Sequence, residues 1–359
     1  MSEEQELKRS PLHDVHVAAG GRMVGFSGWE MPVQYGGILE EHRAVREGCG
    51  VFDISHMGEF VVRGERACEW LDEVLTNRVA SLETGEGQYT LMCNEQGGVI
   101  DDLILYRSGE QEFFLVVNAA KVEEDRAWLR GRLVDGVEFV DESGATAAIA
   151  VQGPGVVDVW QEVVGERLPE RNATLRGEGW RVCRTGYSGE DGFEFFCDAG
   201  VAQDWWARFV EAGAVPCGLG ARDSLRLEMC YPLNGSDLSA ERTPIEAGLG
   251  FFVDLGKNFC GAEVLRRQKE RGLRERLVAL RMIVKGPPPR PHYAIYVAGE
   301  QVGELTSGGQ SPSLGCGIGM GYLPVGLAKV GTLVEIDVRG RRFGAEVVKK
   351  PIYRKGQDA

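Results

Sequence analysis

The feature that most constrains the fold is a change in hydrophobic pattern near Arg274. Before it, segments with helical spacing alternate with segments rich in β-branched and aromatic residues, up to a charged helix predicted over Ala262–Glu270. After it, short alternating segments are separated by glycine-rich turns: Tyr293–Val297, Gln301–Thr306, Gly317–Tyr322, Thr332–Val338 and Arg342–Val348. Short strands spaced in this way predict a small all-β barrel or roll.

The residues before this change predict mixed helix and sheet. Tyr89–Cys93, Val99–Tyr106 and Glu112–Val117 read as a three-stranded meander, and Thr146–Val151 reads as a strand. Helices are predicted over Leu39–Arg46, Arg66–Leu75, Val122–Leu133 and Val156–Val164. A chain of 359 residues also exceeds the usual single-domain length of about 100–200 residues. We therefore predict an α+β protein with mixed α/β regions at 1–140 and 141–273 and an all-β domain at 274–359.

Composition excludes several classes of partner. The net charge of -14 argues against a nucleic-acid partner, which requires a basic face. The 9 cysteines are odd in number and never form a CxxC pair, so they are expected to be reduced thiols. Met1–Ser10 is acidic and polar, and no apolar run reaches the length of about 18 residues that a membrane span needs. We expect a cytoplasmic protein without membrane or nucleic-acid partners.

Several motifs resemble known sites but fail on detail. Gly315–Gly321 is glycine-rich like a dinucleotide fingerprint, but Tyr322-Leu323-Pro324 follows where a helix would have to begin. Gly186–Gly189 lacks the spacing of a nucleophile elbow, so Ser188 is interpreted as a turn residue. His13 and His16 have a metal-compatible spacing without an evident third ligand. We expect no metal and no nucleotide cofactor.

Two adjacent carboxylates, Asp101 and Asp102, interrupt the apolar segment Gly97–Ile104. Neighbouring strand residues point to opposite faces, so at least one of these acids enters a partly apolar environment. One interpretation is a strand end whose acids cap a loop in water. The other is a carboxylate placed to orient or deprotonate an amine.

Two later clusters could form a binding pocket. Arg184–Glu194 combines three glycines with an aromatic ring and three acids, and Gly218–Glu228 opens a helix with Arg222 and Arg226 on one face. Either cluster could be an ordinary solvated turn or an internal salt bridge. Together they could also offer a carboxylate to a ring amide and a guanidinium to a substrate carboxylate.

With these residues, the chain resembles the aminomethyltransferase (T-protein) family of the glycine cleavage system over nearly its whole length. Besides the Asp101 segment and the two clusters, the matching motifs are Phe26–Pro32, Phe52–Met57, Val117–Ala119, Val151–Pro154, Thr243–Glu246 and Thr306–Gly308. The resemblance implies two mixed α/β domains and a C-terminal β-domain around a central folate channel.

The resemblance also implies roles for individual residues. It assigns the catalytic acid to Asp101, the first aspartate of the pair. It assigns folate contacts to Met57, Tyr89, Tyr106, Asn118, Tyr187, Glu194, Arg222 and Arg354. One departure is Asn234, which precedes Gly235 where the family usually has a tyrosine.

The reaction implied by the resemblance transfers a one-carbon unit to tetrahydrofolate, which acts as a co-substrate. The unit arrives as an aminomethyl group on the lipoyl arm of the H-protein, ammonia is released, and methylenetetrahydrofolate forms. The expected partners are the lipoylated H-protein and the other glycine cleavage components. Two alternatives stay open: a folate-dependent demethylase of a small methylated amine or sulfonium compound, and a non-catalytic folate-binding protein.

Overall fold

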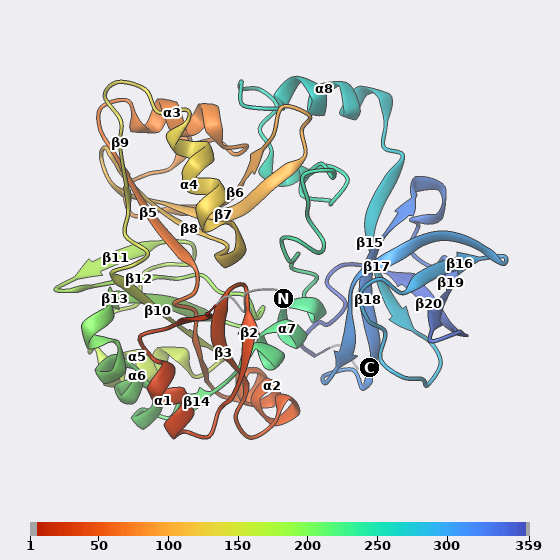
Figure 1. Cartoon of the computed structure of the whole chain (residues 1–359), viewed down its shortest axis with the longest axis horizontal. Helices are drawn as coiled ribbons and strands as arrows, with labels where there is room; N and C mark the ends of the chain where they lie inside the picture. Colours follow the sequence, from red (N-terminus) through yellow and green to blue (C-terminus); the bar gives the residue numbers. More distant parts are fainter. Residues whose placement is uncertain (1–5, 357–359) are drawn as a thin grey trace. The chain divides into compact units, whose positions relative to one another are not determined.

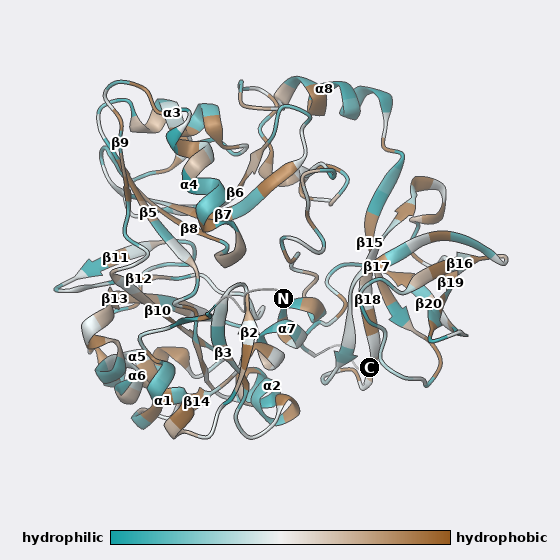
Figure 2. Ribbon diagram, viewed as in Figure 1, coloured by the Kyte–Doolittle hydropathy of each residue, from teal (hydrophilic) through white to brown (hydrophobic). Residues whose placement is uncertain are grey.

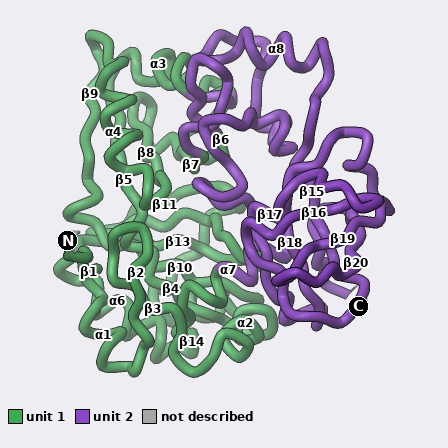
Figure 3. Tube along the Cα trace, turned by 45° about the vertical axis from the view of Figure 1, so that its right-hand side comes forward, with its two compact units in different colours: residues 1–74, 78–90, 102–222 green, residues 75–77, 91–101, 223–359 purple. Residues whose placement is uncertain are grey.

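The computed structural model describes residues 6–356, which form two compact units (Figure 3). Unit 1 comprises residues up to Val74, Arg78–Thr90 and Asp102–Arg222, and unit 2 comprises Leu75–Asn77, Leu91–Asp101 and the chain from Asp223 onwards. The chain passes between the units within β6 (Gly87–Cys93), β7 (Val99–Gly109) and α7 (Leu219–Glu228). Asp101 and Asp102 therefore belong to different units although they are neighbours in one strand.

A six-stranded sheet forms one half of unit 1. In spatial order its strands are β11 (Thr174–Gly177), β12 (Trp180–Cys183), β13 (Gly192–Asp198), β10 (Thr146–Gln152), β4 (Gly50–Asp53) and β14 (Val215–Pro216). Helices α5 (Val156–Val163) and α6 (Ala202–Glu211) pack on it with α1 (His13–Ala18) nearby (Figure 1). The core between them holds Trp160, Phe193 and Phe195. Full burial of each such ring contributes about 1.5–3 kcal/mol, which fixes this sheet firmly beneath the loops that it carries.

The second sheet has five strands in the order β6, β7, β8 (Glu112–Val117), β5 (Gly58–Arg63) and β9 (Glu138–Asp141). Its helices are α3 (Ala67–Val74) and α4 (Val122–Arg130). Val61 and Val62 in β5 are both fully buried although they point to opposite faces, and the adjacent residues Leu115 and Val116 in β8 are buried as well. The sheet is therefore covered on both faces and holds the meander β6–β7–β8 rigidly.

A small N-terminal sheet completes unit 1. Its strands are β1 (Lys8–Arg9), β3 (Trp29–Gln34) and β2 (Arg22–Phe26), followed in the chain by α2 (Ile38–Glu47). Ser27 and Gly28 join β2 to β3 with φ values of 49° and 81°. Two successive positive φ values are what a two-residue hairpin turn requires.

Unit 2 contains a closed barrel. Its strands, in spatial order, are β15 (Glu275–Met282), β18 (Cys316–Pro324), β17 (Glu300–Ser311), β16 (Ala294–Val297), β19 (Leu333–Val338) and β20 (Arg341–Val348). Helix α8 (Ala262–Arg271) buries Ala262 and Leu265, and Figure 2 shows both hydrophobic and hydrophilic residues along it. Short 3-10 helices occur at Val79–Ser81, Ala119–Lys121, Ala199–Val201, Gly250–Phe252 and Val325–Leu327.

The predicted fold class, mixed helices and sheets with a C-terminal β-barrel, is confirmed. The glycine-rich segment Gly315–Gly321 lies largely in β18, as its turn-and-strand interpretation required. The division at residues 140 and 273 and the central channel stay predictions. Among residues 6–356, no helix has the length and apolar character needed to cross a membrane.

Candidate functional site

Three neighbouring strands bring Asp102, Tyr89 and Asn118 together. The Tyr89 hydroxyl on β6 donates a hydrogen bond of 2.8 Å to Oδ2 of Asp102 on β7. The Asn118 amide, directly after β8, donates to Oδ1 of Asp102 at 3.0 Å and to its backbone oxygen at 2.8 Å. All three side chains are half-buried. The three side chains thus form a hydrogen-bonded cluster centred on the Asp102 carboxylate.

The two carboxylates of the pair differ in their access to solvent. Asp101 is fully buried, whereas Asp102 is half-buried, as expected for adjacent residues on opposite faces of β7. Asp102 is the one that meets Tyr89 and Asn118. The assignment of the chemistry to Asp101 stays a prediction, and the geometry makes Asp102 its competitor.

Glu194 on β13 forms a hydrogen-bonded chain with Thr185 and Tyr106. The Thr185 hydroxyl donates to Oε2 of Glu194 at 2.7 Å, and its oxygen lies 2.6 Å from the Tyr106 hydroxyl. Tyr106 is fully buried, and burial holds the pKa of its phenol well above 10, so the ring stays neutral. Tyr106 is therefore shielded from solvent. It restrains Thr185 by a hydrogen bond, and Thr185 in turn restrains Glu194.

Arg222 lies in the first half of α7, with its guanidinium carbon 4.8 Å from the ring centroid of Tyr187. Burial raises the pKa of Glu194, while the Thr185 hydrogen bond and the Arg222 charge oppose the shift. Burial also lowers the pKa of Arg222, against the attraction of Glu194 and Tyr187. The three residues therefore form a partly desolvated cluster, in which Arg222 is the cation, Glu194 the carboxyl group and Tyr187 the aromatic ring.

Two close approaches explain the glycines that position these groups. A Cβ at Gly218, just before α7, would lie 2.4 Å from the backbone carbon of Val33, so only glycine lets the helix begin against β3. A Cβ at Gly186, between Thr185 and Tyr187, would lie 2.0 Å from the Gln152 side chain. Both glycines let the segments that carry Arg222 and Tyr187 approach their supporting sheets closely.

The remaining predicted contacts are Met57 in unit 1 and Arg354 in unit 2. Met57 is half-buried in the turn between β4 and β5, where its backbone N–H donates to the oxygen of Ile54 at 3.0 Å. Arg354 belongs to unit 2, where its Nη2 lies 3.5 Å from the backbone oxygen of Lys350. Asn234, also in unit 2, donates to the oxygen of Ile100 at 3.4 Å. Asn234 therefore contacts the residue that directly precedes Asp101.

The histidines considered as metal ligands are engaged with acids and a phenol instead. Nε2 of His13 lies 2.9 Å from Glu30, and Nε2 of His16 lies 2.9 Å from Asp53, while Nδ1 of His16 meets the Tyr35 hydroxyl at 2.8 Å. Within residues 6–356, no group of three or more His, Cys, Asp or Glu residues is arranged to hold a metal ion.

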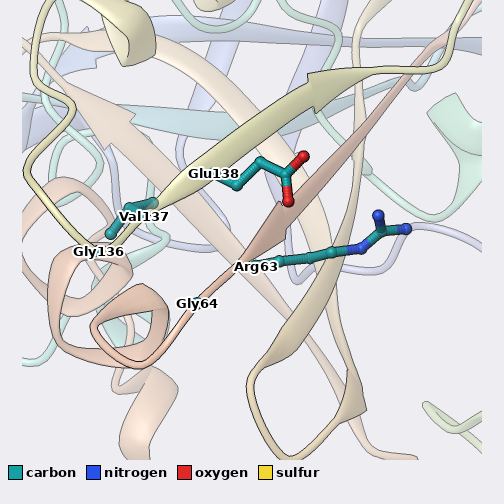
Figure 4. A pocket seen from close by; sticks show the side chains of 5 residues that line it. All are labelled: Arg63, Gly64, Gly136, Val137 and Glu138. Atoms are coloured by element: carbon teal, nitrogen blue, oxygen red, sulfur yellow. The ribbon is translucent and has the colours of Figure 1, made fainter.

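Two surface hollows contain none of the predicted site residues. One of about 320 Å³ is lined by Arg63, Gly64 and the segment Gly136–Glu138, and Figure 4 shows the Arg63 and Glu138 side chains there. The other, of about 490 Å³ in unit 2, includes Arg242, Glu275 and Tyr322. In the second hollow, Arg242 pairs with Glu275 and its guanidinium carbon lies 4.7 Å from the ring centroid of Tyr322.

Sequence reasoning missed the roles of Thr185 and His56. Thr185 is the link between Tyr106 and Glu194, and His56 is a buried histidine beside the charge of Arg222. Both residues lie inside motifs that were identified from the sequence. Only the folded geometry distinguishes them from their neighbours in those motifs.

Comparisons with known proteins cover almost the whole chain. Residues 12–257 match the GCVT N-terminal domain, and residues 275–354 match the glycine cleavage T-protein C-terminal barrel domain. Proteins named aminomethyltransferase are similar: that of Geobacillus kaustophilus is 46% identical over 98% of this chain and 100% of its own length. That of Bacillus mycoides is 45% identical over 98% and 99%.

A solved structure shows the same fold. The crystal structure of glycine cleavage system aminomethyltransferase T from Bartonella henselae superposes with a TM-score of 0.93 at 34% identity. It covers 97% of this chain and 98% of its own. The similarity therefore extends through both units.

Proposed function

The chain belongs to the glycine cleavage T-protein family, and from that premise we propose that it transfers the one-carbon unit of an aminomethyl group to tetrahydrofolate. The donor is the aminomethyl group carried on the dihydrolipoyl arm of the H-protein. The C–S bond to the lipoyl sulfur and the C–N bond to ammonia break, and two C–N bonds to folate nitrogens form. One folate proton goes to the sulfur and the other leaves with ammonia.

The side chains of unit 1 suit a reduced folate as substrate. Its pterin ring is flat and carries both donors and acceptors, which match the Glu194 carboxyl, the Arg222 guanidinium and the Tyr187 ring. A partly desolvated carboxyl and guanidinium hold such a ring more strongly than exposed ones would. The chain's own contribution is orientation and proton handling rather than an electron sink.

The observation that carries the proposal is the half-buried Asp102 carboxylate with its two donors, Tyr89 and Asn118. These donors hold the carboxylate in a fixed orientation, and a positioned carboxylate can orient a folate amine and take up its proton. The family resemblance assigned this role to Asp101. Asp102 is half-buried and accepts hydrogen bonds from Tyr89 and Asn118, two of the predicted folate contacts, so we assign the role to Asp102 and keep Asp101 as the alternative.

The lipoylated H-protein is the proposed partner, with the other glycine cleavage components as the wider assembly. A cytoplasmic location is part of the same proposal. No observation on the described residues favours the demethylase or the non-catalytic folate-binding alternative.

The test is ammonia release from aminomethyl-loaded H-protein, measured with and without tetrahydrofolate. We expect ammonia and methylenetetrahydrofolate in equal amounts, with release strongly dependent on both substrates. Controls are unlipoylated H-protein, and dimethylglycine or another methylated amine in place of the loaded carrier. Turnover of the methylated amine without turnover of the carrier would move the function to the demethylase.

A further inference from the structure

His56 is a buried histidine with an unsatisfied ring nitrogen. It lies in the turn between β4 and β5, directly before Met57, and is 3% exposed. Among the described residues, its Nδ1 atom is buried and meets no hydrogen-bonding partner. A buried polar atom left without a partner costs about 1–3 kcal/mol. An apolar side chain of similar size would avoid this cost.

The ring of His56 is held in place by the N-terminal hairpin. Phe26, at the end of β2, packs against it edge to face, with 5.6 Å between the ring centroids and 82° between the planes. The Ser27-Gly28 turn returns the chain directly after this contact. The Phe26–Pro32 motif thus supplies a wall that orients the imidazole.

The charges of Arg222 and Asp53 both act on the His56 ring. Burial and the Arg222 guanidinium lower its pKa to about 4, while Asp53 acts in the opposite direction. The imidazole is therefore neutral at physiological pH, and it can donate or accept a hydrogen bond at Nδ1 without bringing a charge. Arg222, whose charge acts on this ring, is the residue to which folate binding is assigned above.

We propose that Nδ1 of His56 hydrogen-bonds the pterin half of the bound folate, beside Arg222, and so determines specificity for this ring. The inference rests on the proposed function. A neutral, almost fully buried imidazole suits an uncharged heterocycle with polar atoms along its edge. The glutamyl tail carries carboxylates instead, which are better matched by cations in contact with water.

Three substitutions of His56 distinguish the contribution of Nδ1 from that of Nε2. His56→Asn keeps a polar group close to the position of Nδ1, His56→Gln keeps one close to the position of Nε2, and His56→Leu keeps neither. Dissociation constants are measured by anaerobic calorimetry with tetrahydrofolate and with 6-methyltetrahydropterin, which lacks the aminobenzoylglutamate tail. His292→Leu is the matched control, because the His292 side chain is 83% exposed and lies in unit 2.

We expect His56→Gln and His56→Leu to weaken binding of both probes by roughly tenfold or more, and His56→Asn to stay within about threefold of the wild type. Unchanged binding in the Gln and Leu variants would overturn the inference. A loss confined to tetrahydrofolate would also overturn it, because the contact would then involve the tail. Equal losses in all three variants would overturn the assignment to Nδ1.

A measurement on the unmodified protein removes any dependence on folding of the variants. In protein labelled with ¹⁵N-histidine, the Nδ1 resonance of His56 is expected to shift on addition of 6-methyltetrahydropterin, while that of His292 stays in place. An unshifted Nδ1 resonance at saturating pterin would contradict the proposal. Failure of the wild type to bind tetrahydrofolate would instead overturn the proposed function itself.

Discussion

The hydroxyl of Tyr89 donates a hydrogen bond of 2.8 Å to Oδ2 of Asp102, across two neighbouring strands. This contact connects two residues that the sequence identified for different reasons, one as a folate contact and one as half of a carboxylate pair. Asp102 is half-buried there, whereas Asp101 on the opposite face of β7 is fully buried. The bond restrains the Asp102 carboxylate before any substrate is present.

The first prediction concerns this restraint. Tyr89→Phe removes the hydroxyl and little else, so Asp102 keeps its charge but loses the hydrogen bond from Tyr89. A hydrogen bond to a charged group contributes about 1.5–3 kcal/mol, so turnover should fall by roughly tenfold or more with normal folding. Steady-state ammonia release measures the effect. Wild-type turnover in Tyr89→Phe would mean that the bond has no part in orienting the carboxylate.

The second prediction concerns Arg222. Arg222→Ala removes a charge-assisted contact worth about 1.5–3 kcal/mol, so tetrahydrofolate binding should weaken by one to two orders of magnitude on that estimate. Arg222→Lys is the matched variant. It keeps the charge but loses the planar group that lies over Tyr187. Its affinity for tetrahydrofolate should therefore lie between those of the wild type and Arg222→Ala. Unchanged affinity in a folded alanine variant would remove Arg222 from the site.

The third prediction concerns the buried Asp53. Its carboxylate accepts hydrogen bonds from the Ser10 hydroxyl at 2.6 Å and from the Ser55 N–H at 2.8 Å, and lies 2.9 Å from Nε2 of His16. Burial alone would raise the pKa of Asp53, but these partners lower it overall. Breaking such a network should cost Asp53→Asn about 3 kcal/mol of unfolding free energy at pH 7.

The pH dependence of that loss follows from the direction of the shift. A carboxyl with a lowered pKa stabilises the fold above its unfolded value of about 3.9, and this stability disappears as pH falls through the folded pKa. The gap in Tm between the wild type and Asp53→Asn should therefore be wide at pH 7, begin to narrow near pH 4 and close as pH falls through the lowered pKa of Asp53. A gap independent of pH would show that the carboxylate charge contributes nothing.

The fourth prediction concerns Glu59 in β5, which is fully buried and whose two carboxyl oxygens meet no partner among the described residues. Burial, then the acids Asp141, Glu142 and Glu194, hold its pKa well above 4.5. A raised carboxyl pKa gives stability that is complete below about pH 4.3 and is lost as pH rises through the folded value. Because glutamine does not ionise, Glu59→Gln should not lose this stability as pH rises.

Thermal unfolding of both proteins between pH 5 and 9 measures the difference. The Tm of the wild type should decline relative to that of Glu59→Gln by about 2 °C or more for each pKa unit of the shift, within the interval where Glu59 titrates. Parallel Tm curves for the two proteins across this range would contradict the assigned neutral state of Glu59.

Much of the fold could be predicted from periodicity. The alternating pattern of Val99–Tyr106 and Glu112–Val117 is that of half-buried or buried strands, and both form strands in the structure. Strand β15 was not identified, because Arg276 and Arg281 interrupt its apolar residues. Its place is fixed by pairing with β18 and β20, which are distant in sequence.

The candidate site was predictable only in part. Strand alternation predicts that Asp101 and Asp102 face opposite ways, but not which of them meets Tyr89 and Asn118. That depends on the register between β7 and its neighbours, and on which face the rest of the protein covers. The polar contact of Thr185 with Glu194 likewise joins a loop to the strand that follows it, which no local pattern specifies.

The most direct test of the account compares Asp102→Asn with Asp101→Asn. Each change keeps the size of the side chain and removes its charge and basicity, and a positioned proton-transfer group commonly contributes about 10²–10⁴-fold in rate. Ammonia release from aminomethyl-loaded H-protein and tetrahydrofolate binding are measured for both variants, with folding checked by circular dichroism. The account predicts that Asp102→Asn binds tetrahydrofolate yet turns over at least about a hundredfold more slowly, while Asp101→Asn loses far less. Wild-type turnover in Asp102→Asn, or a larger loss in a folded Asp101→Asn, would contradict it.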